Sequence, residues 1–296
     1  MSDSIEHVSD TAFWVAYYRW LETQRPDALF HDPLAGKLVG DRGKALAGVM
    51  GIERAMAWSM SLRTYIIDNY ILDAVAKGVV RIVNLGAGLD TRPYRLDLRP
   101  DIDWVEVDFA HMIDYKNDAL SADTPRCKLE RIACDLSQGD ARRQLLDALD
   151  QRGGQTLVLT EGVIPYLTNA DVADLANDLC QRDSIVYWIT DYFSPFFHTM
   201  SARGSVKRQL AKNSPFRFNV GDQPNDWVRF FADTGWEVAD MRYIGEEGLK
   251  LGRDLPANWI MRQFMRFAPE ARLRPYRRMN GYALMQKGRK RINLED

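Results

Sequence analysis

The residues best suited to chemistry lie between Arg81 and Asp108, where a glycine-rich turn joins two apolar runs. Gly86 and Gly88 follow the first run directly, so the backbone can turn sharply and present its N–H groups to a ligand. Asp108 ends the second run about 20 residues beyond the turn, the spacing at which an acid meets a ribose hydroxyl. The pattern predicts a nucleotide-binding turn, although a strand-to-helix turn without a ligand has the same sequence features.

Two further acids follow later apolar runs. Asp135 comes shortly after the run 128–133, and Glu161 comes directly after the run 156–160. The carboxyl ends of parallel strands meet at one edge of a sheet, where ligands bind. One acid there is usually a solvated turn residue, but a series of acids suits a nucleoside. Asp108 would then meet the ribose, Asp135 an exocyclic amine and Glu161 a cation.

The elements that position these residues follow from the spacing of apolar side chains. Three helices are expected before the glycine turn, over 11–22, 33–38 and 54–76. Five buried strands are expected over 79–85, 104–107, 128–133, 156–160 and 184–190. Helices over 111–120, 141–149 and 169–180 separate the later strands. This alternation predicts a parallel sheet covered on both faces.

The regular alternation ends near residue 191, which divides the expected single domain into four regions. These are an N-terminal helical region (1–78), a cofactor-binding core (79–191), a lid (192–225) and the C-terminal part of the sheet (226–296). The lid contains an expected helix over 195–210 and a turn-rich piece over 214–224. The last region contains helices over 227–234 and 257–267 and a hairpin-like pair of strands over 236–243 and 281–286.

Composition limits the classes of function. With 296 residues, 46% hydrophobic and 27% charged, the chain has the composition of an ordinary globular protein, and its net charge of −2 argues against a general polyanion binder. Basic residues at 272–278 and 287–291 favour a solvated surface over a nucleic-acid site, because no aromatic platform accompanies the tail.

Other features set expectations for location and metals. The three cysteines are too few for a disulfide framework, so a reducing compartment, the cytoplasm, is expected. The polar N-terminus and the lack of an apolar run of about 18 residues predict neither a signal peptide nor a membrane span. No histidine or cysteine has ligand spacing, so no metal is predicted.

The motifs NLGAGLDTRPYRL, WVEVDF, CDL and TEGVIPYL resemble the leucine carboxyl methyltransferase family, whose bacterial members include polyketide O-methyltransferases. The resemblance extends to VAYYRWLETQRPDALFHDPLA and SLRTYIID and covers residues 11–193. It implies the α/β, Rossmann-like fold of class I methyltransferases. That fold has a mostly parallel seven-stranded sheet with helices on both faces, here with an N-terminal helical extension and a helical lid insertion. It also implies S-adenosyl-L-methionine as the cofactor.

The resemblance assigns roles to residues that match the family motifs. It places Gly86 and Gly88 at the methionine part of the cofactor, Asp108 on the ribose, Asp135 and Leu136 around the adenine, Arg63 on the cofactor carboxylate and Glu161 near the amino group and substrate pocket.

Three other arginines carry weaker or different expectations. Arg19 is a weaker match to the family, and a solvated arginine on the first helix explains it equally well. Arg92 and Arg95 are interpreted as structural partners of Asp90 or Asp97.

The expected reaction requires few catalytic side chains. A carboxylate acceptor is ionised at neutral pH and needs no general base, whereas a phenol or alcohol needs one. Candidates that could orient or deprotonate an acceptor are Tyr166, Tyr192 and His198. Each has a packing role as the alternative. The lid phenylalanines could enclose an apolar acceptor or merely cover the sheet.

The leading hypothesis is an S-adenosylmethionine-dependent O-methyltransferase acting on a carboxylate or hydroxyl of a small, polyketide-like molecule. A protein C-terminus stays open as the acceptor, and the sequence predicts no oligomeric state. The alternatives are an NAD(P)-dependent oxidoreductase and a non-catalytic S-adenosylmethionine-binding protein. Thr91 stands where a dinucleotide-binding motif would have its third glycine, which disfavours the oxidoreductase.

Overall fold

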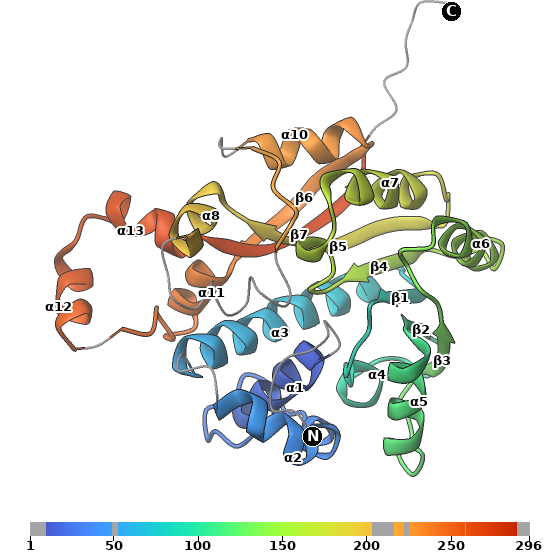
Figure 1. The fold of residues 1–296 in the computed structure, drawn as a ribbon, viewed down its shortest axis with the longest axis horizontal. Coiled ribbons are helices and arrows are strands. Elements are labelled where there is room, and N and C mark those ends of the chain that lie inside the picture. The colour runs from blue at the N-terminus through green and yellow to red at the C-terminus, as the bar shows by residue number, and fades with distance from the viewer. Residues whose placement is uncertain (1–9, 49–52, 203–215, 222–224, 258, 289–296) are drawn as a thin grey trace, which may run out of the picture.

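The computed structural model describes residues 10–48, 53–202, 216–221, 225–257 and 259–288. At its centre lies one seven-stranded sheet in the order β3-β2-β1-β4-β5-β7-β6 (Figure 1). β1 to β5 run parallel, and β7 runs antiparallel to both β5 and β6. The strands are Arg81–Leu85 (β1), Asp103–Asp108 (β2), Lys128–Ala133 (β3), Thr156–Thr160 (β4), Ile185–Phe193 (β5), Trp236–Tyr243 (β6) and Asn280–Lys287 (β7).

The helices surround this sheet. Those before β4 are Asp10–Thr23 (α1), Pro33–Gly48 (α2, kinked at Gly40), Glu53–Ala76 (α3), Arg92–Arg95 (α4), Ala110–Ala119 (α5) and Gly139–Asp150 (α6). Those after β4 are the 3-10 helix Ile164–Tyr166 (η1) and the α-helices Asn169–Cys180 (α7), Pro195–Ala202 (α8), Asp226–Asp233 (α10), Ile244–Lys250 (α11), Trp259–Phe267 (α12) and Glu270–Arg277 (α13). No described helix is long and apolar enough to span a membrane.

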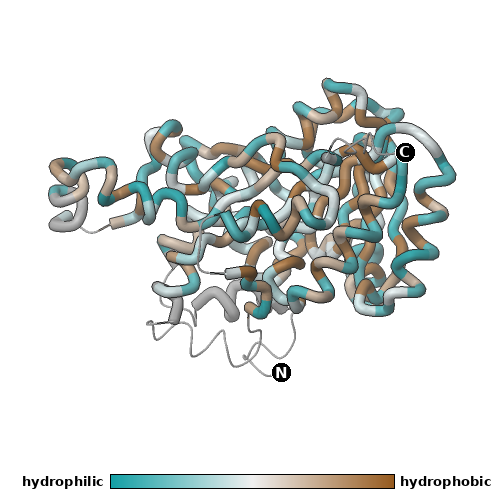
Figure 2. The backbone as a smooth tube through the Cα atoms, turned by 90° about the horizontal axis from the view of Figure 1, so that it is seen from above, coloured by the Kyte–Doolittle hydropathy of each residue, from teal (hydrophilic) through white to brown (hydrophobic). Residues whose placement is uncertain are grey.

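Alternating strand residues supply two hydrophobic cores, one on each face. On β1, Val83 and Leu85 join a core built with α6, α7 and α10, while Ile82 joins the core formed with α3. Successive side chains of a strand point to opposite faces, so the nearly uninterrupted apolar run of β1 is what burial on both faces requires. Figure 2 shows the hydrophobic stretches concentrated in the interior and hydrophilic ones along the outer helices and loops.

The sequence predicted most of these elements. The expected strands 128–133, 156–160 and 236–243 and the helix 169–180 have the bounds found in the structure. The strand expected over 184–190 extends to Phe193. The helix expected over 195–210 is α8 as far as 202, and 203–210 lies outside the described residues. The described part of the turn-rich piece, 216–221, forms no helix or strand.

The late strands differ from a simple hairpin. β6 and β7 pair antiparallel as expected, but α11, α12 and α13 separate them in sequence. β7 also lies between β5 and β6, so β6 forms the sheet edge. α4, α11 and α13 were not predicted. α13 contains Pro275, and a proline in this position argues against a helix in the sequence because it has no backbone N–H to donate.

Candidate active site

The glycine turn leaves β1 at the carboxyl edge of the parallel strands. Gly86 and Gly88 have φ angles of 74° and 46°, which glycine adopts without the steric cost that a Cβ brings. The N–H groups of Gly86 and Ala87 donate to the Val107 carbonyl at 2.8 and 3.1 Å, so the turn is attached to β2.

Asp108 fixes the far side of the same turn. Its Oδ2 accepts a hydrogen bond from the Gly88 N–H at 2.7 Å, and its Oδ1 accepts from the Phe109 N–H at 2.7 Å. The side chain is partly exposed. The structure therefore brings Gly86, Gly88 and Asp108 together in one turn.

Asp135 and Leu136 follow β3 at the same edge of the sheet. Hydrogen bonds from the Ser137 hydroxyl and amide lower the pKa of Asp135 below its ordinary value. Leu136 packs against the core that α6 and α7 cover, and its carbonyl accepts a hydrogen bond from Arg142 at 2.9 Å. Neither residue contacts Arg63 or Glu161 in any described hydrogen bond or ion pair, so they form a separate part of the edge.

Glu161, directly after β4, is held between two arginines. Arg63 Nε of α3 donates to Glu161 Oε1 at 2.5 Å, and Arg92 Nη1 donates to Oε2 at 2.6 Å. Burial disfavours the charged carboxylate, but the two guanidinium groups outweigh burial and lower the pKa of Glu161 to about 2. For Arg63 burial also opposes the charge, yet Glu161 raises the pKa of Arg63 above its ordinary value. The pair therefore stays ionised at neutral pH.

Arg92 extends this pair into a buried network. Its guanidinium also contacts Asp68 of α3 at 2.7 Å and Asp90 at 2.8 Å, and Asn84 of β1 donates to Asp90 at 2.8 Å. The Arg92–Asp90 pair was predicted. Arg95 pairs with Asp68 and not with Asp97, because Arg92 and Arg95 both reach from α4 to this acid on α3.

Arg19 is not a solvated arginine. It is 6% exposed, donates from Nε to Asp32 at 2.9 Å and donates from Nη2 to the Leu89 carbonyl at 2.5 Å. These contacts join α1 to the loop that follows the glycine turn. The interpretation of Arg19 as a solvated residue was wrong, because the sequence of a single helix does not show which other segments pack against that helix.

Asp191 on β5 is a residue that the sequence analysis missed. It is 3% exposed, and its Oδ2 accepts a hydrogen bond from the Gly162 N–H at 2.9 Å. The Tyr282 hydroxyl of β7 also donates to its carboxylate. Burial raises the pKa of Asp191 to about 6, and the positive charge of Arg63 offsets this effect only in part. The signal was present, since Asp191 continues the series of acids at strand ends.

The three proposed acceptor-site side chains lie in different environments. Tyr166 in η1 is partly buried, contacts the ring of Phe216 at 5.4 Å and hydrogen bonds with Thr11. Tyr192 is 6% exposed and packs edge-to-face on Trp227 at 5.4 Å. Burial raises the pKa of both tyrosines, to about 12 for Tyr192.

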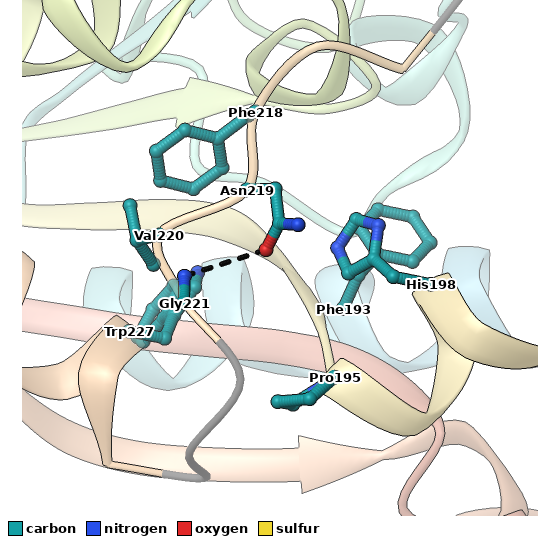
Figure 3. Close-up of a pocket in the computed structure, with 8 residues that line it drawn as sticks. All are labelled: Phe193, Pro195, His198, Phe218, Asn219, Val220, Gly221 and Trp227. Carbon is teal, nitrogen blue, oxygen red and sulfur yellow. Dashed lines mark hydrogen bonds between the residues drawn. The ribbon is translucent and has the colours of Figure 1, made fainter.

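His198 of α8 lies at a pocket just beyond the end of β5 (Figure 3). The pocket has an empty volume of about 320 Å³, open side included, and is lined by Phe193, Pro195, His198, Phe218, Asn219, Val220, Gly221 and Trp227. Asn219 Oδ1 accepts a hydrogen bond from the Gly221 N–H at 3.4 Å. The lining is thus mostly apolar, with an imidazole and an amide as its polar groups.

The phenylalanines of the region 192–225, expected to form a lid, divide between the two expected uses. Phe218 belongs to the core and packs against Phe230 and Phe231. Phe193 and Phe216 contact each other at 5.3 Å, and Phe216 also meets Tyr166. These aromatic contacts connect the pocket to the carboxyl end of β4.

The burial and grouping of the described cysteines and potential metal ligands indicate neither a reactive thiol nor a metal site: the cysteines are unpaired and partly or fully buried. All three cysteines are free, and burial raises the pKa of Cys127 to about 12. Among the described residues, no group of three or more His, Cys, Asp or Glu side chains is arranged to hold a metal ion.

The chain matches the model of the leucine carboxyl methyltransferase family over residues 12–180. A candidate S-adenosyl-L-methionine-dependent methyltransferase from Parafrankia is 34% identical over 276 residues, covering 88% of this chain and 83% of that protein. Another from Streptomyces avermitilis is 30% identical over 275 residues, covering 86% and 93%.

Solved structures agree on the fold. The crystal structure of a candidate methyltransferase from Thermobifida fusca superimposes with a TM-score of 0.53 at 15% identity, covering 97% of this chain and 96% of that one. A DUF574 family protein from Streptomyces avermitilis gives a TM-score of 0.52 at 15% identity, covering 92% and 96%. The seven-stranded sheet is therefore the class I methyltransferase fold. By its sequence and its fold, the chain belongs to the leucine carboxyl methyltransferase family and is an S-adenosyl-L-methionine-dependent methyltransferase.

Proposed function

We propose that this enzyme methylates an oxygen atom, a carboxylate or a hydroxyl, of a small polyketide-like acceptor. The pocket beyond β5 carries the proposal. Its walls include the rings of Phe193 and Trp227, and its polar groups are His198 and Asn219. Apolar walls with a few polar groups suit a small, largely apolar molecule that is oriented through one polar end.

The glycine turn fits the cofactor. A Cβ at Gly86 would lie 2.5 Å from Val163 Cγ2, and one at Gly88 would lie 3.2 Å from the Ala12 side chain. Both positions therefore favour glycine, because a side chain would crowd Val163 or Ala12, and the backbone of the turn stays free of side chains of its own. We assign Gly86 and Gly88 to the methionine part of the cofactor and Asp108 to its ribose.

The adenine position follows the next strand. Asp135 lies in the loop after β3, and its ionised carboxylate suits the exocyclic amine of adenine. Leu136 next to it supplies an apolar contact for the ring. These assignments rest on the family motif and on the position of both residues at the carboxyl edge.

Arg63 and Glu161 suit the zwitterionic end of the cofactor. A guanidinium binds a carboxylate through paired, charge-assisted hydrogen bonds, and a glutamate accepts from an ammonium group. In this proposal Arg63 turns toward the cofactor carboxylate, while Arg92 keeps Glu161 paired. The buried charges thus remain balanced when the cofactor binds.

The bound cofactor supplies an activated methyl group whose leaving group is already in place. This chain then has to align the acceptor oxygen and exclude water. A carboxylate acceptor needs no base, whereas for a hydroxyl we propose His198 as the base. The raised pKa values of Tyr166 and Tyr192 keep both hydroxyls protonated at neutral pH, so we assign Tyr166 to orienting the acceptor and Tyr192 to supporting the pocket wall through Trp227.

The proposal includes no metal, nucleic acid or membrane partner, and it places the enzyme in the cytoplasm. The net charge of −2 supports the absence of a nucleic-acid partner, and the free cysteines support the cytoplasm.

The test is a methyl-transfer assay with labelled S-adenosylmethionine. The acceptors would be aliphatic and aromatic carboxylic acids, phenols and a peptide with a free C-terminal carboxylate. We expect a labelled small molecule, and release of methanol by mild alkali would separate an ester from an ether. Transfer to the peptide alone, or to no oxygen of any small acceptor, would contradict the proposal.

A matched pair of variants links the product to the pocket. Phe193→Ala removes a lining ring, whereas Phe196→Ala removes a ring that packs on Tyr276 and does not line the pocket. We expect the first variant to raise the acceptor KM about tenfold, which corresponds to part of a buried aromatic contact. The control should leave it within about twofold.

A further inference from the structure

Asp191 is a buried acid that has no role in the proposed reaction. It is a buried carboxylate at the carboxyl end of β5, and it has no ion-pair partner within 4.0 Å among the described residues. Burying a carboxylate without a paired cation costs stability, which makes such a group, next to a site, a candidate for a functional role.

Asp191 controls the backbone next to Glu161. Gly162, which donates to Asp191 at 2.9 Å, has a φ angle of 71°, and a Cβ there would lie 2.9 Å from Arg63 Nη2. The Arg63 guanidinium thus packs directly on the Gly162 backbone. A shift of that backbone would displace Glu161 and Arg63 together.

Tyr282 completes this arrangement from the next strand. It stands directly opposite Asp191 in the antiparallel β5–β7 register, donates to its carboxylate and lies with its ring centre 6.0 Å from the Arg63 guanidinium carbon. The Tyr70 hydroxyl of α3 donates to the Tyr282 carbonyl at 3.2 Å. Asp191 and Tyr282 therefore join β4, β5 and β7 to the helix that carries Arg63.

We propose that Asp191, supported by Tyr282, is a positioning residue that sets the Gly162 backbone, and through it Arg63 and Glu161, for the methionine end of the cofactor. This inference rests on the cofactor roles assigned above to Arg63 and Glu161. Asp191 acts through its neighbours, and its charge adds attraction for a cofactor that carries one net positive charge.

The charged state of Asp191 makes the role measurable. The titratable groups that face it are Arg63 from α3, Glu161 after β4, Tyr282 from β7 and Tyr166 from η1. Arg63 and Glu161 stay ionised and both tyrosines stay neutral from pH 5 to 8. Asp191 alone in this group titrates in that range, because burial raises its pKa to about 6.

The experiment is calorimetric titration of the full chain with S-adenosylmethionine between pH 5 and 8. The wild type should bind about tenfold more tightly above pH 7 than at pH 5. Asp191→Asn keeps an oxygen acceptor for Gly162 but carries no charge, so it should bind with the pH-independent affinity of the wild type at low pH. Asp191→Ala leaves the Gly162 N–H without its acceptor and should bind about tenfold more weakly than Asp191→Asn.

Variants of the tyrosines provide the matched control. Tyr282→Phe should weaken cofactor binding about threefold. Tyr187→Phe should leave it unchanged, because Tyr187 lies on the same face of β5 as Asp191 but near the start of that strand. Equal affinities of Asp191→Ala, Asp191→Asn and the wild type, or a pH dependence that persists in Asp191→Asn, would overturn the inference. These titrations use no acceptor, so their result is distinct from a failure of the proposed O-methylation.

Discussion

Arg63 and Glu161, 98 positions apart in the sequence, form a partly buried ion pair with Nε and Oε1 2.5 Å apart. One comes from the long helix α3 and the other from the end of β4, so the pair exists only when α3 covers the sheet. Its two charges match the two charges of an amino acid, which is why the methionine end of the cofactor is assigned here.

Removing the arginine should affect binding more than folding. Arg63→Ala deletes a charge-assisted partner of the cofactor carboxylate, and we expect about a 100-fold loss of S-adenosylmethionine affinity by calorimetry. Glu161 keeps Arg92 as a partner, so the protein should still fold. Arg143→Ala, which removes an exposed pair with Asp140, is the control and should bind normally. Unchanged affinity of Arg63→Ala would refute the assignment.

Acid should reveal the stabilising charge of Glu161. Its pKa is lowered to about 2 from an ordinary value of 4.5, so its contribution to stability is complete above pH 4.5 and disappears as the pH falls toward 2. Urea unfolding should show the wild type losing more stability than Glu161→Gln over that interval. Parallel losses in the two proteins would show that the carboxylate is not stabilised by its arginines.

Asp191 should have the opposite effect. Its pKa is raised to about 6 from an ordinary value of 3.8, so the folded state binds the proton more tightly and stability falls as the pH rises through this interval. Asp191→Asn should therefore be more stable than the wild type at pH 7, by up to about 3 kcal/mol, with a smaller difference at pH 4. A variant that is more stable but binds the cofactor less tightly would separate a functional from a structural role. Lower stability at pH 7 would contradict the assignment.

The glycine turn can be tested with a matched glycine. Gly86→Ala places a Cβ 2.5 Å from Val163 at a φ of 74°, whereas Gly153→Ala meets nothing within 4 Å at a φ of 65°. Both should lose about 1 kcal/mol from backbone strain. Gly86→Ala should lose a further 1–3 kcal/mol from steric overlap and should bind the cofactor weakly. Thermal unfolding measures the difference, and equal losses would mean that the turn yields to a side chain.

The sequence predicted the parts of the molecule that depend on local patterns. β1 and β4 are buried, mostly apolar runs, and Gly86 and Asp108 follow from the chemistry of a turn and a strand end. The same rule indicated Glu161. The rule also applies to Asp191, which directly follows the strand expected over 184–190, but the sequence analysis did not use it there.

Contacts between distant segments could not be predicted in the same way. The Arg92 network depends on where α3 lies in the fold, since Arg92 pairs with Asp68 of that helix, 24 positions away. Tyr282 faces Asp191 only because β7 lies between β5 and β6, and no local pattern specifies that order. The pocket likewise combines the end of β5 with α8 and α10.

The most direct test of the central claim is a crystal structure with bound S-adenosylhomocysteine. The account predicts the carboxylate of this product on Arg63, its ribose hydroxyls on Asp108 and its sulfur directed toward the pocket at Phe193. A product bound away from the glycine turn, or bound there with Arg63 still paired only to Glu161, would contradict it.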